Sequence, residues 1–185
     1  MKKFVEESWL VLVMGVIFAC LLAGTQTSLS ARIAENQQRV LLQAIGEVVP
    51  GVETTEEFKI ESNQVFKCLD KNGELVGWAV DASGGGFVDK IRLVVGIRAD
   101  GREITGLKVI ENLETPGLGN KIEGPWAEQY TGISTDLSLT VIKGDADPAR
   151  GEISAITGAT WSSRYVTDIV NDVLTRIRPK LAEQQ

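Results

Sequence analysis

An uncharged stretch near the start of the chain limits most strongly what this sequence can fold into. From Trp9 to Gly24 it reads WLVLVMGVIFACLLAG, and the following TQTSL is uncharged as well. Together they give about 20 residues, the length that a helix needs to cross a bilayer. Two lysines precede the stretch, and the positive-inside rule keeps them on the cytoplasmic side. We therefore expect a cytoplasmic segment at 1–8 and a single-pass anchor at 9–29 in the cell (inner) membrane, with the rest of the chain on the extracytoplasmic side.

Two other interpretations of this stretch stay open. A secretory signal peptide has the same hydrophobic pattern and is removed from the mature protein. Ala19-Cys20 is compatible with a lipoprotein site, although Phe18 is bulky for the position two before such a cysteine. We predict an uncleaved anchor in which Cys20 is a helix residue.

The composition excludes several classes of site. The chain has no histidine and only two cysteines, Cys20 and Cys68. A Ser-His-Asp or Cys-His mechanism is therefore impossible, and neither a thiolate metal cluster nor an iron–sulfur centre fits this chain alone. The formal net charge of −6 argues against a nucleic-acid surface. We expect no metal, no nucleic-acid partner and no catalytic residue.

Beyond the anchor, the hydrophobic pattern predicts a juxtamembrane helix over 30–50 and one domain over 51–185. Two turn signals, Asn72-Gly73 and Asp100-Gly101, lie between alternating apolar runs and predict two hairpins. DLSLTVIK, at 136–143, predicts a further strand, and residues 162–181 have the apolar spacing of an amphipathic helix packed on the sheet. The expected fold class is α+β, an antiparallel sheet with flanking helices, preceded by one transmembrane helix.

Three segments interrupt this scaffold. SGGGF, at 83–87, is either a flexible loop or a place where something approaches the backbone closely. ETPGLG, at 114–119, contains Pro116-Gly117, which predicts a type II turn. TGATWSS, at 157–163, directly precedes the last helix, where unpaired N–H groups and the helix dipole favour a phosphate.

Each segment also has an ordinary structural explanation. Ser162 or Thr160 can cap the helix, which contributes about 1 kcal/mol. Glu114 can be a solvated carboxylate, and a lysine at a strand end, such as Lys143, is usually solvated. One cap does not account for all four hydroxyls of TGATWSS, so a cap, a phosphate site and a modified hydroxyl all stay open.

ETPGLG followed by TGAT resembles the FMN-binding domain of respiratory flavoproteins, the family of the RnfG subunit of the Rnf complex and of the NqrC subunit of the sodium-translocating NADH:quinone reductase. The likeness extends over nearly the whole chain, from the anchor through GGGF and VIKG to the last helix, and the compact length is closer to RnfG. In this family a flavin transferase joins FMN through its phosphate to a threonine of the [ST]GAT motif, which by position is Thr160 here. The resemblance thus implies covalent FMN.

The same resemblance implies a function and a set of contacts. The chain is expected to be an electron-relay subunit of a membrane-bound, ion-translocating ferredoxin:NAD oxidoreductase, a non-autonomous part of a translocase that works with other membrane subunits. The residues expected to contact the flavin are Glu114, Thr115, Gly117, Leu118, Gly119, Lys143, Thr157, Gly158, Ala159 and Ser162. Two positions depart from the family pattern, Asn112 where a histidine is frequent and Ser154 where an aspartate is frequent.

Three alternatives remain beside this hypothesis. The chain could be an NqrC-like subunit or a stand-alone flavinylated electron carrier. A membrane-anchored module that binds a ligand without flavin is a different class of protein with the same anchor.

Overall fold

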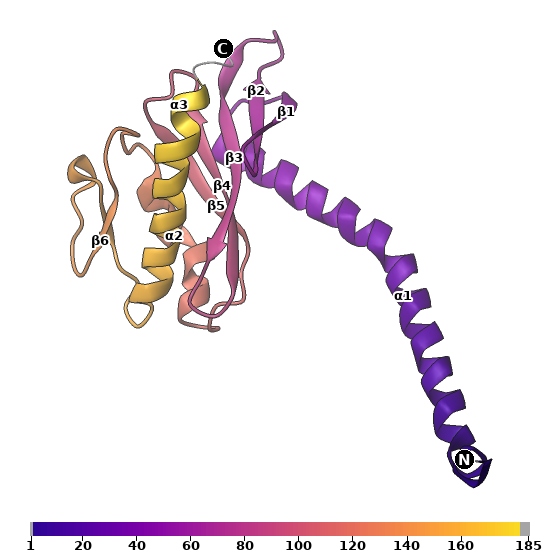
Figure 1. Ribbon diagram of the computed structural model, residues 1–185. Helices are drawn as coiled ribbons and strands as arrows, with labels where there is room; N and C mark the ends of the chain where they lie inside the picture. Colours follow the sequence, from indigo (N-terminus) through magenta and orange to yellow (C-terminus); the bar gives the residue numbers. More distant parts are fainter. Residues whose placement is uncertain (1, 182–185) are drawn as a thin grey trace. The chain divides into compact units, whose positions relative to one another are not determined.

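The computed structural model describes the backbone of residues 2–181 and the side chains of residues 9–181. The chain divides into two compact units, one up to Val40 and one from Leu41 onward. A single helix, α1 (Lys2–Val48), runs from the first unit into the second, so the helix predicted after the anchor is its continuation (Figure 1).

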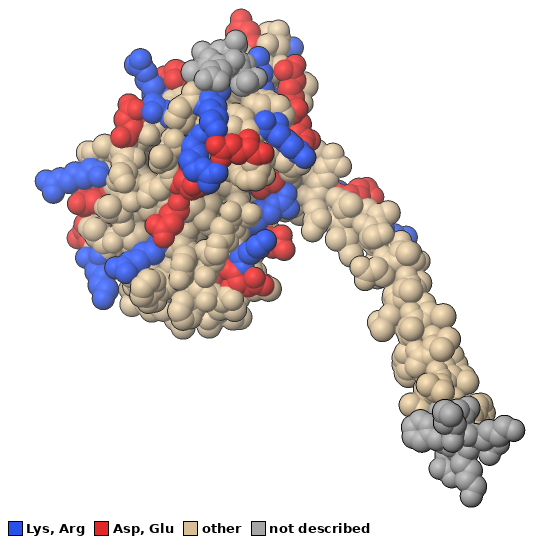
Figure 2. All heavy atoms as spheres, in the orientation of Figure 1, with Lys and Arg blue, Asp and Glu red and all other residues tan. Residues whose placement is uncertain are grey.

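Helix α1 is the one helix in the described part of the chain that is long and apolar enough to cross a membrane. Its apolar window has a mean hydropathy of 2.1, and no part of that window is buried. Large side chains such as Trp9, Leu12 and Phe18 are exposed along it, and Figure 2 shows a stretch of helix surface without charges there. Length and composition therefore agree with the predicted transmembrane helix.

The second unit is built on a five-stranded antiparallel sheet whose strands follow one another in chain order. They are β1 (Thr54–Ile60), β2 (Asn63–Leu69), β3 (Leu75–Gly85), β4 (Lys90–Arg98) and β5 (Ile104–Glu111). Both predicted hairpins are present, and Gly73 and Gly101 have the positive φ values, +81° and +70°, that their turns require. β1 was not predicted, because most of its side chains are exposed and it lacks a clear apolar face.

One face of the sheet is covered by the last helical segments (Figure 1). These are α2 (Thr160–Asp172), the π-helical turn η4 (Val173–Ile177) and α3 (Arg178–Leu181). The predicted apolar positions of this region are all buried, namely Val166, Ile169, Val170, Val173, Leu174 and Ile177. The prediction of an amphipathic helix packed on the sheet is confirmed.

Short elements connect the sheet to α2. The 3-10 helices η1 (Gly119–Glu123), η2 (Pro125–Tyr130) and η3 (Pro148–Arg150) lie among them. The strand predicted within DLSLTVIK is β6 (Thr140–Ile142), which pairs in parallel with β7 (Glu152–Ser154) as a separate two-stranded sheet.

The opposite face of the five-stranded sheet holds the last turns of α1. Ile45 and Val48 are buried there against β3 and β4. Gly96 and Gly106 allow this close packing, because a Cβ atom on Gly96 would lie 2.3 Å from the Val48 carbonyl oxygen. The Thr105 hydroxyl donates to the same carbonyl and satisfies one acceptor at the end of the helix.

The glycine segment at 84–86 also serves close packing. Gly84 and Gly85 belong to β3, and none of the three glycines has a positive φ. A Cβ atom on Gly84 would lie 2.6 Å from Cγ1 of Ile169, and one on Gly86 would lie 2.5 Å from Oε1 of Glu114. The flexible-loop interpretation is wrong, because these glycines let α2 and a carboxylate approach the backbone of the sheet.

We predict that Gly84→Ala destabilises the protein by about 1–3 kcal/mol, because the added methyl group forces Ile169 out of its place. Thermal unfolding of the full chain in detergent measures the change. Gly85→Ala is the matched control, since a Cβ atom there meets nothing within 4 Å. Ile169→Ala should relieve part of the cost in the double variant; equal losses from Gly84→Ala and Gly85→Ala would contradict the packing argument.

Candidate functional site

The turn in ETPGLG lies against the start of α2. The Thr115 carbonyl accepts from the Leu118 N–H at 3.1 Å, and Gly117 has a φ of +77°. This is the positive φ that a type II turn requires at its third residue, so the predicted turn is confirmed. Leu118 reaches the second motif, since a Cβ atom on Gly158 would lie 3.2 Å from Leu118 Cδ2.

The first turn of α2 has no side-chain cap. The helix begins at Thr160, and its N-cap residue, Ala159, makes no side-chain hydrogen bond. The Ser162 hydroxyl donates instead to Oε2 of Glu114 at 2.7 Å, and Ser163 Oγ accepts from a backbone N–H of the preceding loop at 3.0 Å. The capping interpretation of Ser162 and Thr160 is therefore wrong, and the N–H groups of this turn are free to face an anion.

Thr160 stands at the border of two cavities. Its side chain is half-buried, and its hydroxyl has no hydrogen-bond partner among the described residues. The larger cavity has a volume of about 610 Å³ and the smaller one a volume of about 180 Å³. Thr160 lines both, together with Gly158 and Trp161.

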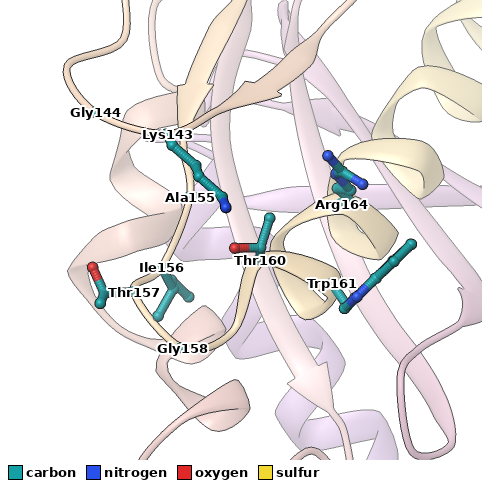
Figure 3. A pocket seen from close by; sticks show the side chains of 9 residues that line it. All are labelled: Lys143, Gly144, Ala155, Ile156, Thr157, Gly158, Thr160, Trp161 and Arg164. Atoms are coloured by element: carbon teal, nitrogen blue, oxygen red, sulfur yellow. The ribbon is translucent and has the colours of Figure 1, made fainter.

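The larger cavity is positively charged. Its described lining contains Lys143 and Arg164 and no carboxylate. Figure 3 shows the Lys143 ammonium pointing toward Thr160. The Arg164 guanidinium carbon lies 5.1 Å from the centre of the Trp161 ring, a cation–π contact. Two cations next to the open start of a helix make this cavity suitable for a phosphate.

The smaller cavity has an apolar border. Phe87, Leu118 and Trp161 line it and are 61%, 44% and 56% exposed, respectively. Val88, directly after Phe87, is exposed as well. Such a cluster of exposed apolar side chains is typical of a binding surface, and a flat aromatic ring fits its chemistry.

Residues 86–175 match the sequence profile of the FMN-binding domain. The G subunit of the ion-translocating oxidoreductase complex of Methanosarcina acetivorans is 31% identical over 183 residues, which cover 94% of this chain and 94% of that protein. The chain belongs to this family of G subunits. The G subunit of the Na(+)-translocating ferredoxin:NAD(+) oxidoreductase complex of Acetobacterium woodii is 45% identical over 101 residues, or 54% of this chain and about half (48%) of that relative.

Solved structures share the fold of this chain. NqrC of Shewanella oneidensis superposes with a TM-score of 0.60 at 22% identity, over 75% of this chain and 74% of that one. The C subunit of the Na(+)-translocating NADH-quinone reductase of Parabacteroides distasonis gives 0.59 at 16% identity, over 80% and 91%. The expected α+β fold is thus confirmed, and FMN is the cofactor of the domain.

The residues around Thr160 fit FMN. The larger cavity supplies two cations and helix N–H groups for a phosphate, and the smaller one supplies apolar side chains for a ring. Thr160 is common to both, whereas the exposed Thr157 lines the larger cavity only. The unpartnered hydroxyl of Thr160 also lies where Figure 3 shows the Lys143 ammonium pointing.

Most of the residues predicted to contact the flavin lie at these two cavities. Those at the smaller cavity are Thr115, Leu118, Gly119, Gly158, Ala159 and Ser162. Those at the larger cavity are Lys143, Thr157 and Gly158. The two that line neither are Gly117, at the tip of the turn, and Glu114, which is buried behind it.

Sequence reasoning does not select Phe87, Trp161 or Arg164 as site residues. Phe87 follows the glycines. Both interpretations of that segment concern the glycine backbone, so neither assigns a role to the Phe87 side chain. Trp161 belongs to the quoted motif, and Arg164 lies four residues after Thr160, on the same face of α2. That spacing is the available signal for Arg164.

The two departures from the family pattern have local roles. The Asn112 side chain accepts from the Glu114 N–H at 3.0 Å and donates to Glu123, which braces the turn. The Ser154 hydroxyl donates to the Gly144 carbonyl at 2.8 Å and accepts from the Ala146 N–H at 3.1 Å. Ser154 therefore holds the loop that follows Lys143.

We predict that Thr160→Ala changes the free energy of unfolding by no more than about 0.5 kcal/mol, because its hydroxyl supports nothing in the fold. Ser163→Ala should cost about 1–3 kcal/mol, because it leaves a buried N–H group without an acceptor. Thermal unfolding of both variants without flavin shows which hydroxyl stabilises the fold and which does not. A loss near 1 kcal/mol for Thr160→Ala would restore the capping interpretation.

Proposed function

We propose that Thr160 carries FMN as a phosphoester and that this subunit relays electrons in a membrane-bound, ion-translocating ferredoxin:NAD oxidoreductase of the Rnf type. The observation that carries the proposal is the unpartnered Thr160 hydroxyl at the border of a cationic cavity and an apolar one. Membership of the G-subunit family supports the same assignment.

The attachment requires a hydroxyl, a place for a phosphate and an external enzyme. The Thr160 oxygen forms a bond to the phosphorus of a flavin nucleotide donor, and the P–O bond from that phosphorus to the donor's leaving group breaks. The leaving group takes up the proton that the hydroxyl loses. A flavin transferase catalyses this step. Lys143, Arg164 and the first N–H groups of α2 stabilise the charge of the phosphoester.

The chain supplies position and electrostatics to the relay. Bound FMN supplies the redox chemistry, accepting and releasing electrons one or two at a time. The exposed border of Phe87, Leu118 and Trp161 orients the ring and leaves part of it accessible to partner subunits. Such a site suits electron transfer between proteins better than turnover of a small substrate.

We further propose that α1 anchors this subunit in the cell (inner) membrane with the second unit on the extracytoplasmic side. Lys2 and Lys3 and the uncharged stretch that follows them support this orientation. Other membrane subunits of the complex are the electron donor and acceptor. An NqrC-like assignment rests on the shared fold alone, at 22% identity, and is therefore second to the Rnf type.

We predict that the full chain co-expressed with a flavin transferase gains about 438 Da, the mass of FMN less one water. In-gel flavin fluorescence should survive denaturation, because the bond is covalent. Thr160→Ala should abolish both signals and Thr157→Ala should retain the added mass. Flavin retained on Thr160→Ala, or no added mass on the wild type while the transferase modifies a control substrate, would refute the attachment.

A second prediction concerns the cations of the larger cavity. Lys143→Met and Arg164→Gln should each slow flavin transfer to Thr160 roughly several-fold, and the double variant by about tenfold or more, because the phosphate loses its charge-assisted partners. Time courses of the added mass measure this effect. Lys71→Met, in the distant turn between β2 and β3, is the control. Added salt should narrow the difference from the wild type; identical rates for all variants would exclude a role for these cations.

A further inference from the structure

Glu114 is a buried carboxylate that connects three separate segments. Its side chain is 4% exposed. Oε1 accepts from the backbone N–H groups of Phe87 and Val88 at 2.7 and 3.2 Å, and Oε2 accepts from the Ser162 hydroxyl at 2.7 Å. One side chain therefore joins the ETPGLG turn to the segment that follows β3, at Phe87 and Val88, and to the first turn of α2.

The fold leaves a fitted space for this carboxylate. A Cβ atom on Gly86 would lie 2.5 Å from Oε1, and one on Gly119 would lie 2.9 Å from Oε2. A larger residue at either glycine would therefore displace the Glu114 side chain. No lysine or arginine in the described part of the chain forms an ion pair with it, so hydrogen bonds alone compensate its burial.

These bonds fix the border of the smaller cavity. Phe87 is held through its own backbone, Leu118 through the turn that directly follows Glu114, and Trp161 through the helix turn that contains Ser162. The three apolar side chains of the cavity border thus come from three segments that share one buried partner. A hydrophobic interaction alone would not fix three loop backbones relative to one another, because it is not directional.

We propose that Glu114 is a positioning residue, which locks the three segments together and so shapes the border around Thr160 before any flavin is attached. The role given to this lock rests on the proposed flavin site. The hydrogen bonds that form the lock lie within the protein and do not require flavin. A preformed border lowers the ordering cost of bringing the flavin to the hydroxyl.

Three variants separate the effect of the Glu114 hydrogen bonds from the effect of its charge. Glu114→Gln keeps the shape: its amide oxygen can accept from the Phe87 and Val88 N–H groups, and its NH₂ group can donate to the Ser162 oxygen. Glu114→Ala removes all three bonds and leaves buried donors unpaired. Ser162→Ala releases only the helix turn. Glu128→Ala, an exposed glutamate on η2, is the control.

Hydrogen exchange of the full chain in detergent, without flavin, tests the lock directly. Glu114→Ala should raise exchange roughly tenfold or more both at 86–88 and at 156–163, where the N–H groups of Ile156, Ala159 and Ser163 are hydrogen-bonded, with β4 unchanged. Ser162→Ala should raise exchange at 156–163 alone, and Glu114→Gln should stay within about threefold of the wild type at both segments. Wild-type exchange at both segments in Glu114→Ala, or a Glu114→Gln variant as loose as Glu114→Ala, would overturn the proposal.

Flavin loading provides the functional arm of the experiment. On co-expression with the transferase, Glu114→Ala should carry less added mass than the wild type and Glu114→Gln should restore it. Should Glu114→Ala also loosen β4, the Ser162→Ala result decides: faster exchange confined to 156–163 supports the lock, and unchanged exchange there refutes it. A wild type that takes up no flavin refutes the proposed function and leaves the exchange result to decide the role of Glu114.

Discussion

The site depends on how closely α2 can approach the sheet. The start of this helix carries Thr160, and its body rests on β3 at Gly84, where any side chain would collide with Ile169. Because the Ile169 side chain packs directly on the Gly84 backbone, the start of α2 lies close enough to the segment after β3 for Glu114 to bond to both. The glycines are therefore a condition for the site as well as for the core, since the three motif segments meet only if α2 lies this deep.

The four hydroxyls of TGATWSS divide between structure and chemistry. Ser162 and Ser163 are buried, and both are used in hydrogen bonds that fasten the helix start to its surroundings. Thr157 is exposed, and Figure 3 shows its side chain apart from that of Thr160. Thr160 alone combines partial burial, an unpartnered hydroxyl and neighbouring cations. This division explains why Thr160 can be singled out for modification while Ser162 and Ser163 are needed by the fold.

The sequence was sufficient for those parts of the fold that depend on local periodicity. The long apolar helix, the two hairpins at Gly73 and Gly101, and the buried face of α2 were all predicted, since each is encoded by neighbouring residues. β1, β7 and the parallel pairing of β6 with β7 were missed, whereas β6 lies within the predicted strand at 136–143. An exposed edge strand has no apolar alternation, and three-residue strands exist only through a partner distant in the chain.

The site shows the same limit. Motif resemblance selected Thr160 and the turn around Gly117, but the role of Glu114 depends on donors 26 to 48 residues away in the chain. Its burial could not be predicted because a glutamate next to a turn is usually solvated. The two interpretations of the glycines could not be separated for a related reason: the sequence shows that they lack side chains, and only the fold shows what occupies the space.

The exposure of the cavity border bears on the proposed covalent bond. Pockets that retain small ligands by contacts alone typically bury 70–90% of the ligand surface, whereas Phe87, Leu118 and Trp161 remain 44–61% exposed. An open border of this kind offers few contacts to a freely exchanging flavin. A tether removes that requirement, because it holds the group at an effective concentration on the order of millimolar, where weak contacts suffice to orient it. The same openness leaves the ring accessible to a partner protein, so the proposed phosphoester reconciles retention of the cofactor with access for electron transfer.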